Sequence, residues 1–147
     1  MSGDVDTLLA DYALAWSRIA AEHILPFWDA DAFRFYKAEE IDRPFTRWPD
    51  AVAYWQGNAR LHRAVRLAFP EAHALPLTAD WRTVVARMRW DIRFADTAPA
   101  AVAGKAMGGE NHVVMLLHGD RLAGWGEMPD APVSYIRRMH MALARDV

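Results

Sequence analysis

Three charged side chains in the C-terminal half of the chain have types and spacing suited to acid–base chemistry. Arg89 and Asp91 lie two residues apart in a segment with strand periodicity, so they share one face of that strand. If that face lined an apolar pocket, the two would form a charge-assisted pair with shifted pKa values, as proton transfer requires. Glu127 lies at the end of a later strand and adds a carboxylate. We predict that Arg89, Asp91 and Glu127 form the polar cluster of a candidate active site.

The same strand has a second interpretation. Its even positions, from Val84 to Phe94, are apolar, and its odd positions carry most of the charges. Amphipathicity alone would place the even face in the core and the charged face in solvent. The sequence leaves both interpretations open.

Two further residues are candidates for handling charge on a substrate. Tyr12 lies on the apolar face of the first predicted helix and should point inward, where its hydroxyl would meet a ligand oxygen or a buried protein partner. His112 has an ordinary pKa near neutrality, so it would serve as a proton shuttle or as a core histidine. We include both in the catalytic set.

Large, adaptable side chains are abundant for a chain of this length. The sequence has seven Trp, seven Met, six Phe and four Tyr, and such residues line apolar pockets as well as cores and dimer interfaces. The predicted substrate-binding residues are Trp16, Tyr36, Trp55, Asn111, Met115 and Trp125.

The sequence predicts neither a metal site nor a cofactor. His112 and His118 share one face of a strand but would lie about 20 Å apart, too far to hold one ion. With no cysteine in the chain, disulfides and thiolate zinc sites are excluded. Phosphate-binding Gly-rich loops and the Gly-x-Ser-x-Gly nucleophile motif are also missing.

Composition limits the class of protein. The 147 residues fit a single domain over residues 1–147, and 53% hydrophobic residues suffice for a real core. A net charge of −2 argues against nucleic acid as a partner. No apolar run approaches the ~18 residues of a membrane span, and the acidic N-terminus does not resemble a signal peptide. We therefore expect a cytoplasmic protein that binds no membrane.

Helices and one strand are predicted for the first half of the chain. Apolar residues recur at helical spacing from Val5 to Phe27, as one helix capped by Asp4 or as two helices nearly end to end. A strand follows at 33–41. A helix is predicted from about Asp50 to Leu67, with Pro49 in its first turn and Pro70 closing the segment.

Strands dominate the second half. We predict a short strand at 75–78, a long one at 82–94, a loop at 95–109 that folds partly as a hairpin arm, and strands at 112–118 and 121–127. Gly119 and Asp120 form the tight turn between the last two, and Pro132 opens a final helix. Strands that follow helices predict an α+β fold.

Three stretches resemble the nuclear transport factor 2-like superfamily, in particular its SnoaL-like polyketide cyclase, ketosteroid isomerase and limonene-epoxide hydrolase branches. They are 11–33, which begins Asp-Tyr-Ala-Leu-Ala-Trp; 48–70, which begins Trp-Pro-Asp-Ala-Val; and 120–127, Asp-Arg-Leu-Ala-Gly-Trp-Gly-Glu. The resemblance implies a cone-shaped, curved antiparallel sheet with N-terminal helices over its concave face, a cystatin-like α+β barrel. It also implies no cofactor and a homodimer through the outer sheet face. Such a dimer would cover Met88, Trp90 and Ile92 and so favour the facing that turns Arg89 and Asp91 inward.

Individual residues match these branches unevenly. Tyr12 resembles the oxyanion-binding tyrosine of ketosteroid isomerases, and Arg89, Asp91 and Glu127 resemble the epoxide-hydrolase cluster. Tyr36 stands where those families carry Asp or Asn, and a phenol with a pKa near ~10 is a poor general base. Either Asn111 or His112 corresponds to the isomerase oxyanion Asp.

The sequence predicts a cofactor-independent acid–base enzyme that binds a small hydrophobic molecule, aromatic or cyclic, of the isomerase, lyase, dehydratase, cyclase or epoxide-hydrolase type. The alternative is a non-catalytic ligand-binding or dimerisation module on the same fold.

Overall fold

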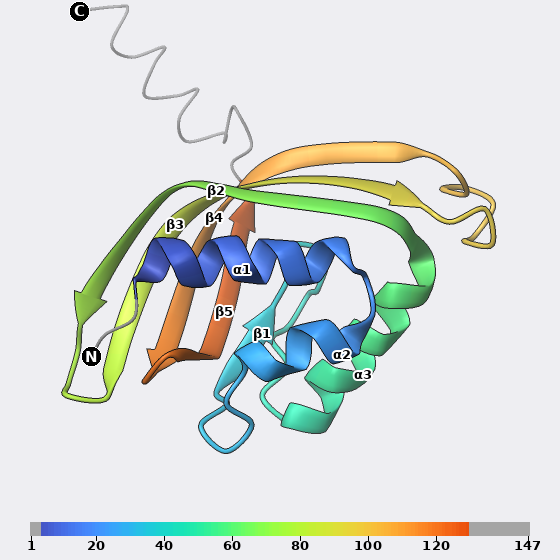
Figure 1. Cartoon of the computed structure of the whole chain (residues 1–147). Coiled ribbons are helices and arrows are strands. Elements are labelled where there is room, and N and C mark those ends of the chain that lie inside the picture. The colour runs from blue at the N-terminus through green and yellow to red at the C-terminus, as the bar shows by residue number, and fades with distance from the viewer. Residues whose placement is uncertain (1–3, 130–147) are drawn as a thin grey trace, which may run out of the picture.

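A curved five-stranded sheet organises the structure, a computed structural model that describes residues 4–129. The strand order is β1-β5-β4-β3-β2. The strands are β1 (Phe35–Lys37), β2 (His62–Pro76), β3 (Trp81–Phe94), β4 (Ala106–His118) and β5 (Arg121–Pro129). The strands from β2 to β5 form an antiparallel series that bends over the helices (Figure 1). The predicted α+β class and helix-covered curved sheet are confirmed.

Two features of the sheet differ from the prediction. The sheet is open, with β1 and β2 as its edges, and does not close into a barrel. In addition, β1 pairs with β5 in parallel, so the sheet is mixed. The Phe35 ring lies over Gly124, where a Cβ atom would come within 2.6 Å of the ring, so the missing side chain lets β1 lie against β5.

The N-terminal helices lie on the concave face. Helix α1 (Val5–Ser17) crosses under the sheet and packs against β2 (Figure 1), and the Asp4 side chain caps it by accepting from Asp6 N at 3.1 Å, as predicted. The chain turns at Ile19, whose φ is 70°, into α2 (Ala21–Ile24) and the short 3-10 helix η1 (Leu25–Phe27). The interpretation as helices nearly end to end is therefore correct.

The boundary between the third helix and the second strand was predicted wrongly. Helix α3 (Trp48–Leu61) begins with Pro49 in its first turn as expected, but ends six residues before Leu67. The segment that follows is the start of β2, whose alternate side chains Val65, Leu67 and Phe69 pack against the core. Pro70 lies in the register shift between Ala68 and Glu71, where an edge strand tolerates proline. The predicted short strand at 75–78 is the end of this one long strand.

The strand predicted at 33–41 is only three residues long, Phe35–Lys37, whereas the strands of the second half occur close to their predicted positions. β4 begins at Ala106, so residues 106–109 of the predicted loop belong to this strand and form the expected hairpin arm with β3. Gly119, with a φ of 57°, forms the turn between β4 and β5 as predicted. The predicted helix that opens at Pro132 lies outside the described residues. No helix among residues 4–129 is long and apolar enough to cross a bilayer.

An aromatic cluster fills the space between the helices and the sheet. Trp28, on the segment after η1, has its ring 5.0 Å from Trp55 of α3 and 5.9 Å from Tyr36 of β1. Trp48 completes the group at 5.7 Å from Trp55. These rings fix β1 and α3 against each other, and both elements line the candidate site.

Candidate functional site

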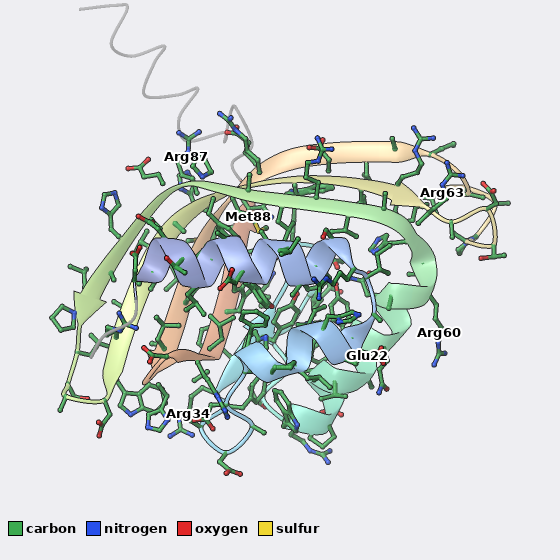
Figure 2. All side chains as sticks on the ribbon, in the orientation of Figure 1. Glu22, Arg34, Arg60, Arg63, Arg87 and Met88 are labelled. Atoms are coloured by element: carbon green, nitrogen blue, oxygen red, sulfur yellow. The ribbon has the colours of Figure 1, made fainter. Side chains whose placement is uncertain are left out.

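The facing of β3 decides which side chains can enter the pocket. Its even positions point to the concave side: Met88 is 4% exposed, and Trp90 and Ile92 pack against the core. Its odd positions point to the convex side, and Figure 2 shows the neighbours Arg87 and Met88 on opposite sides of the sheet. The interpretation from amphipathicity alone is correct, and Met88, Trp90 and Ile92 line the pocket.

The expected grouping of Arg89 and Asp91 with Glu127 must be corrected. Arg89 Nε donates to Glu110 Oε1 at 2.5 Å on the convex face, and Glu110 also accepts from Arg87 NH2 at 2.8 Å. Asp91 is exposed on the same face. The pleat puts both residues on the side away from the pocket, because their inward neighbours supply the apolar wall. The predicted homodimer through this face stays a prediction.

The other two predicted catalytic residues also lie outside the pocket. His112 is on the convex side of β4, opposite Arg87, while its neighbour Asn111 points inward. Tyr12 does point inward, but it is completely buried and its hydroxyl accepts from Trp28 Nε1 at 3.1 Å. Tyr12 thus meets a protein partner and does not line the pocket.

A pocket of about 520 Å³ lies between the concave face of the sheet, α1, α3 and the segment after β1. This volume is typical of sites for small organic molecules. Its lining is mainly apolar and aromatic, with polar groups from β1, α3, β2, β4 and β5. The lining residues that the following argument uses are Tyr36, Tyr54, Trp90, Asn111, Trp125 and Glu127.

Glu127 forms the polar end of this pocket, where three donors hold its carboxylate. Trp125 Nε1 donates to Oε1 at 2.9 Å. Oε2 accepts from Asn111 Nδ2 at 2.9 Å and from Glu39 N at 3.0 Å. An ionised carboxylate has about four acceptor sites, so this arrangement leaves one for a ligand proton.

Burial raises the pKa of the Glu127 carboxyl above its ordinary value of 4.5. The hydrogen bonds from Trp125, Glu39 and Asn111 oppose the rise, and the charge of Glu40 adds to it. A carboxylate with a raised pKa holds protons more strongly than one in water, which is what a general base needs. Glu127 is therefore the only predicted catalytic residue that the structure places in the pocket.

The raised pKa of Glu127 makes stability depend on pH in a defined direction. Between pH 4.5 and the folded-state pKa, the folded protein keeps a proton that the unfolded chain releases. The free energy of unfolding of the wild type, relative to Glu127→Gln, should therefore fall as the pH rises through this window. Urea denaturation at a series of pH values measures the difference.

Glu110→Gln is the matched control for this measurement. The Arg89 and Arg87 guanidinium groups lower the pKa of Glu110, so its stabilising contribution is lost only as the pH falls below 4.5. Above pH 4.5 the difference between wild type and Glu110→Gln should stay constant. A constant difference for Glu127→Gln over the same range would contradict the assignment of a raised pKa.

Tyr36 lies beside this carboxylate on the neighbouring strand, in register with Trp125. Its residue is 3% exposed, and burial together with the charge of Glu127 raises the pKa of its hydroxyl well above 10.0. The Trp55 indole opposes this shift. The main chain of Tyr36 pairs with Phe45, but its hydroxyl has no hydrogen bond of normal geometry to another residue in the described part of the chain. Tyr36 is therefore a neutral phenol with its proton free to donate.

The predicted substrate-binding residues divide between pocket and core. Trp16, Tyr36, Asn111 and Trp125 line the pocket. Met115 and Trp55 do not, because they are 0% and 1% exposed within the core. Asn111 also accepts from Trp90 Nε1 at 3.4 Å, so Trp90, Asn111 and Glu127 form one polar chain.

Sequence reasoning missed several lining residues. His62 lies where α3 meets β2, and burial lowers the pKa of its imidazole, so it is neutral at pH 7. Tyr54 donates to Glu40 at the exposed side of the pocket. The period-two pattern of Val65, Leu67 and Phe69 signals the strand but would place Arg63, not His62, on the concave face. The irregularity in the pairing between His62 and Ala64 breaks that alternation, so the sequence carried no local signal for His62. Within residues 4–129 no group of His, Asp and Glu is placed to hold a metal ion.

The sequence matches no protein-family model, and no curated protein matches it significantly. A nuclear transport factor 2 (NTF2-like) superfamily protein from Salmonella enterica matches the structure with a TM-score of 0.71, at 6% identity, over 88% of this chain and 91% of that chain. This chain has the NTF2-like fold.

Two other structures extend the NTF2-like match. A proposed aromatic ring hydroxylase from Novosphingobium aromaticivorans gives a TM-score of 0.72 at 12% identity, covering 88% of this chain and 89% of that chain. A proposed scytalone dehydratase from the same species gives 0.69 at 8% identity, covering 85% and 80%. Because the sequence identities are so low, these matches show a shared fold and nothing more. They confirm the NTF2-like fold that the sequence resemblance predicted.

Proposed function

We propose that the protein is a cofactor-independent acid–base enzyme for a small hydrophobic molecule, with Glu127 as the general base. The observation that carries the proposal is a desolvated carboxylate at the polar end of an otherwise apolar pocket. Perturbed carboxyl groups in such pockets are candidates for catalysis on physical grounds. A protein of the same fold carries a dehydratase name, and dehydration is a reaction of this class.

The chemistry follows from the two groups that meet at this end of the pocket. The free acceptor site of the Glu127 carboxylate takes a proton from a substrate carbon. The Tyr36 hydroxyl donates a hydrogen bond to the oxygen that gains charge as the proton leaves. Trp125, Asn111 and the Glu39 amide hold the carboxylate in place, so little reorganisation is needed on proton transfer.

One observation favours the alternative, a non-catalytic binding module. Three donors already hold the Glu127 carboxylate. These hydrogen bonds are sufficient for a purely structural role, in which Glu127 fixes β5 against the segment after β1. The two functions differ in one property, because only a general base accelerates the removal of a proton from carbon.

The elimination of 5-nitrobenzisoxazole tests for such a base. A base removes the proton from the carbon next to the ring nitrogen, the nitrogen–oxygen bond breaks, and the coloured isomer 2-cyano-4-nitrophenolate forms. We expect the wild-type rate to exceed that of free acetate at equal concentration, and to rise with pH through an inflection above 4.5, the ordinary value for the Glu127 carboxyl.

An inflection below 4.5, or no inflection, would point to a base other than Glu127. A wild-type rate no greater than that of acetate would favour the binding module. Bound ligand would then be detected without turnover.

A further inference from the structure

The charged groups of the pocket all have one sign. Its lining includes three carboxylates, from Glu39, Glu40 and Glu127, and no lysine or arginine among the described residues. The one basic side chain in the lining is His62, whose burial favours the neutral ring. A negatively charged ligand would meet repulsion here and, within residues 4–129, no cationic side chain in the lining.

Four basic residues on the elements that form the pocket walls are engaged elsewhere. Arg87 and Arg89 pair with Glu110 on the convex face, and Arg63 pairs with Asp96 at 3.9 Å. Lys37, next to Tyr36 on β1, donates to the Ala38 carbonyl at 3.3 Å. The chain as a whole has 17 basic and 19 acidic residues, so the one-signed lining arises from the arrangement of the side chains and not from composition.

Aromatic rings accompany the carboxylates. Trp16, Tyr36, Tyr54, Trp90 and Trp125 all line the pocket, and three of them are tryptophans, the ring type with the strongest attraction for cations. The buried hydroxyl of Tyr36 has no hydrogen-bond partner of normal geometry in the described part of the chain. The ring face and the oxygen of this neutral phenol are therefore available to a cation.

The pocket also has an apolar end. Ile92 pairs with Met107, and Ile92 lies four residues along β3 from Met88, which pairs with Asn111. Four residues of strand span about 13 Å, so this end is well separated from Glu127. A ligand that fills the pocket would place one end among carboxylates and rings and the other against aliphatic side chains.

We propose that the pocket takes an apolar organic ammonium ion, with its nitrogen among Glu127, Glu40 and the aromatic rings and its hydrocarbon part toward Ile92 and Met107. The inference rests on the proposed function in one respect, the assignment of Glu127 to the ligand pocket. It names the substrate class as hydrophobic amines, and it excludes carboxylates and phosphates.

The test compares benzyltrimethylammonium with its neutral carbon isostere, 2,2-dimethylpropylbenzene, at neutral pH. The two have the same shape, so charge alone separates them. Titration followed by tryptophan fluorescence should show the ammonium ion binding at least about tenfold more tightly. Phenylacetate, an anion of similar size, should show no measurable binding.

Matched glutamate variants locate the effect. Glu127→Gln and Glu40→Gln should each reduce the preference for the ammonium ion, whereas Glu110→Gln, on the convex face, should leave it unchanged. Equal or tighter binding of the isostere, no measurable binding of the ammonium ion, or a preference that both pocket variants retain would overturn the proposal.

The outcomes separate this inference from the proposed function. Selective ammonium binding by a protein that does not eliminate 5-nitrobenzisoxazole would uphold the inference and reject the general base. Elimination of 5-nitrobenzisoxazole by a protein that prefers the neutral isostere would uphold the general base and reject the inference of an ammonium ligand. When both hold, benzyltrimethylammonium should inhibit the elimination competitively.

Discussion

Glu127→Gln should lower the rate of 5-nitrobenzisoxazole elimination by about 10²–10⁴-fold, the usual contribution of a positioned general base. Glutamine keeps the size of the side chain and can still accept from Trp125, but an amide cannot take the proton. The expected loss is in turnover, because the apolar walls that bind the neutral probe are unchanged. Initial rates over a range of probe concentrations would separate kcat from KM.

Glu110→Gln is the matched control for this measurement. It makes the same chemical change on the convex face, where the carboxylate pairs with Arg87 and Arg89 on the side of the sheet that faces away from the pocket. Its rate should equal that of the wild type. Equal rates for Glu127→Gln and the wild type would remove Glu127 from the mechanism, and equal losses in both variants would indicate a general effect on folding.

Trp55→Ala should have the largest effect on stability, lowering the free energy of unfolding by about 3–5 kcal/mol. Trp55 is 1% exposed, and its ring lies within 5.7 Å of the ring centres of Trp28, Tyr36 and Trp48. Truncation leaves a cavity among rigid rings that cannot collapse easily. Its indole nitrogen has no hydrogen bond of normal geometry to any residue of the described range 4–129, so the loss comes from packing. Denaturation in urea measures it.

Trp90→Ala is the control for size. Trp90 is half-buried and lines the pocket, so its removal should cost about 1 kcal/mol while weakening ligand binding. Trp55→Phe should recover part of the stability lost in Trp55→Ala. A cost for Trp55→Ala no greater than that for Trp90→Ala would show that Trp55 is not a core residue.

Local patterns predicted the main elements well. The period-two alternation of 82–94 identified β3 almost to the residue, and Gly119 and Asp120 marked the turn into β5. Helical spacing and the Asp4 cap identified α1. Each of these features depends on neighbouring residues, so the sequence carries its signal directly.

The sequence was less informative where competing local signals met. Apolar residues near the end of α3 fitted both a helix and a strand, and the strand formed because Val65, Leu67 and Phe69 complete the concave face. The parallel pairing of β1 with β5 left no local signal at all. It depends on the fit of the Phe35 ring over Gly124, about ninety residues away in the chain.

The candidate site shows the same division. Of the predicted polar cluster, Glu127 lies in the pocket, whereas Arg89 and Asp91 lie on the convex face with Glu110. Residue type identified all three as candidates, but a charge on a strand is equally compatible with solvent and with a pocket. The decision came from Met88, Trp90 and Ile92, whose burial fixes the opposite face of β3 inward.

By itself, the sequence determined the α+β class and an apolar, aromatic-rich interior, because these follow from periodicity and composition. Three of its stretches also resemble the NTF2-like superfamily. Only the tertiary structure decided which polar groups meet in that interior. The groups at the polar end of the pocket come from three strands and one connecting segment, and only folding brings them together. They are Glu127, Asn111, Trp125, Tyr36 and the Glu39 amide. The pKa of a carboxyl depends on such surroundings, so the chemistry of Glu127 is a property of the folded chain.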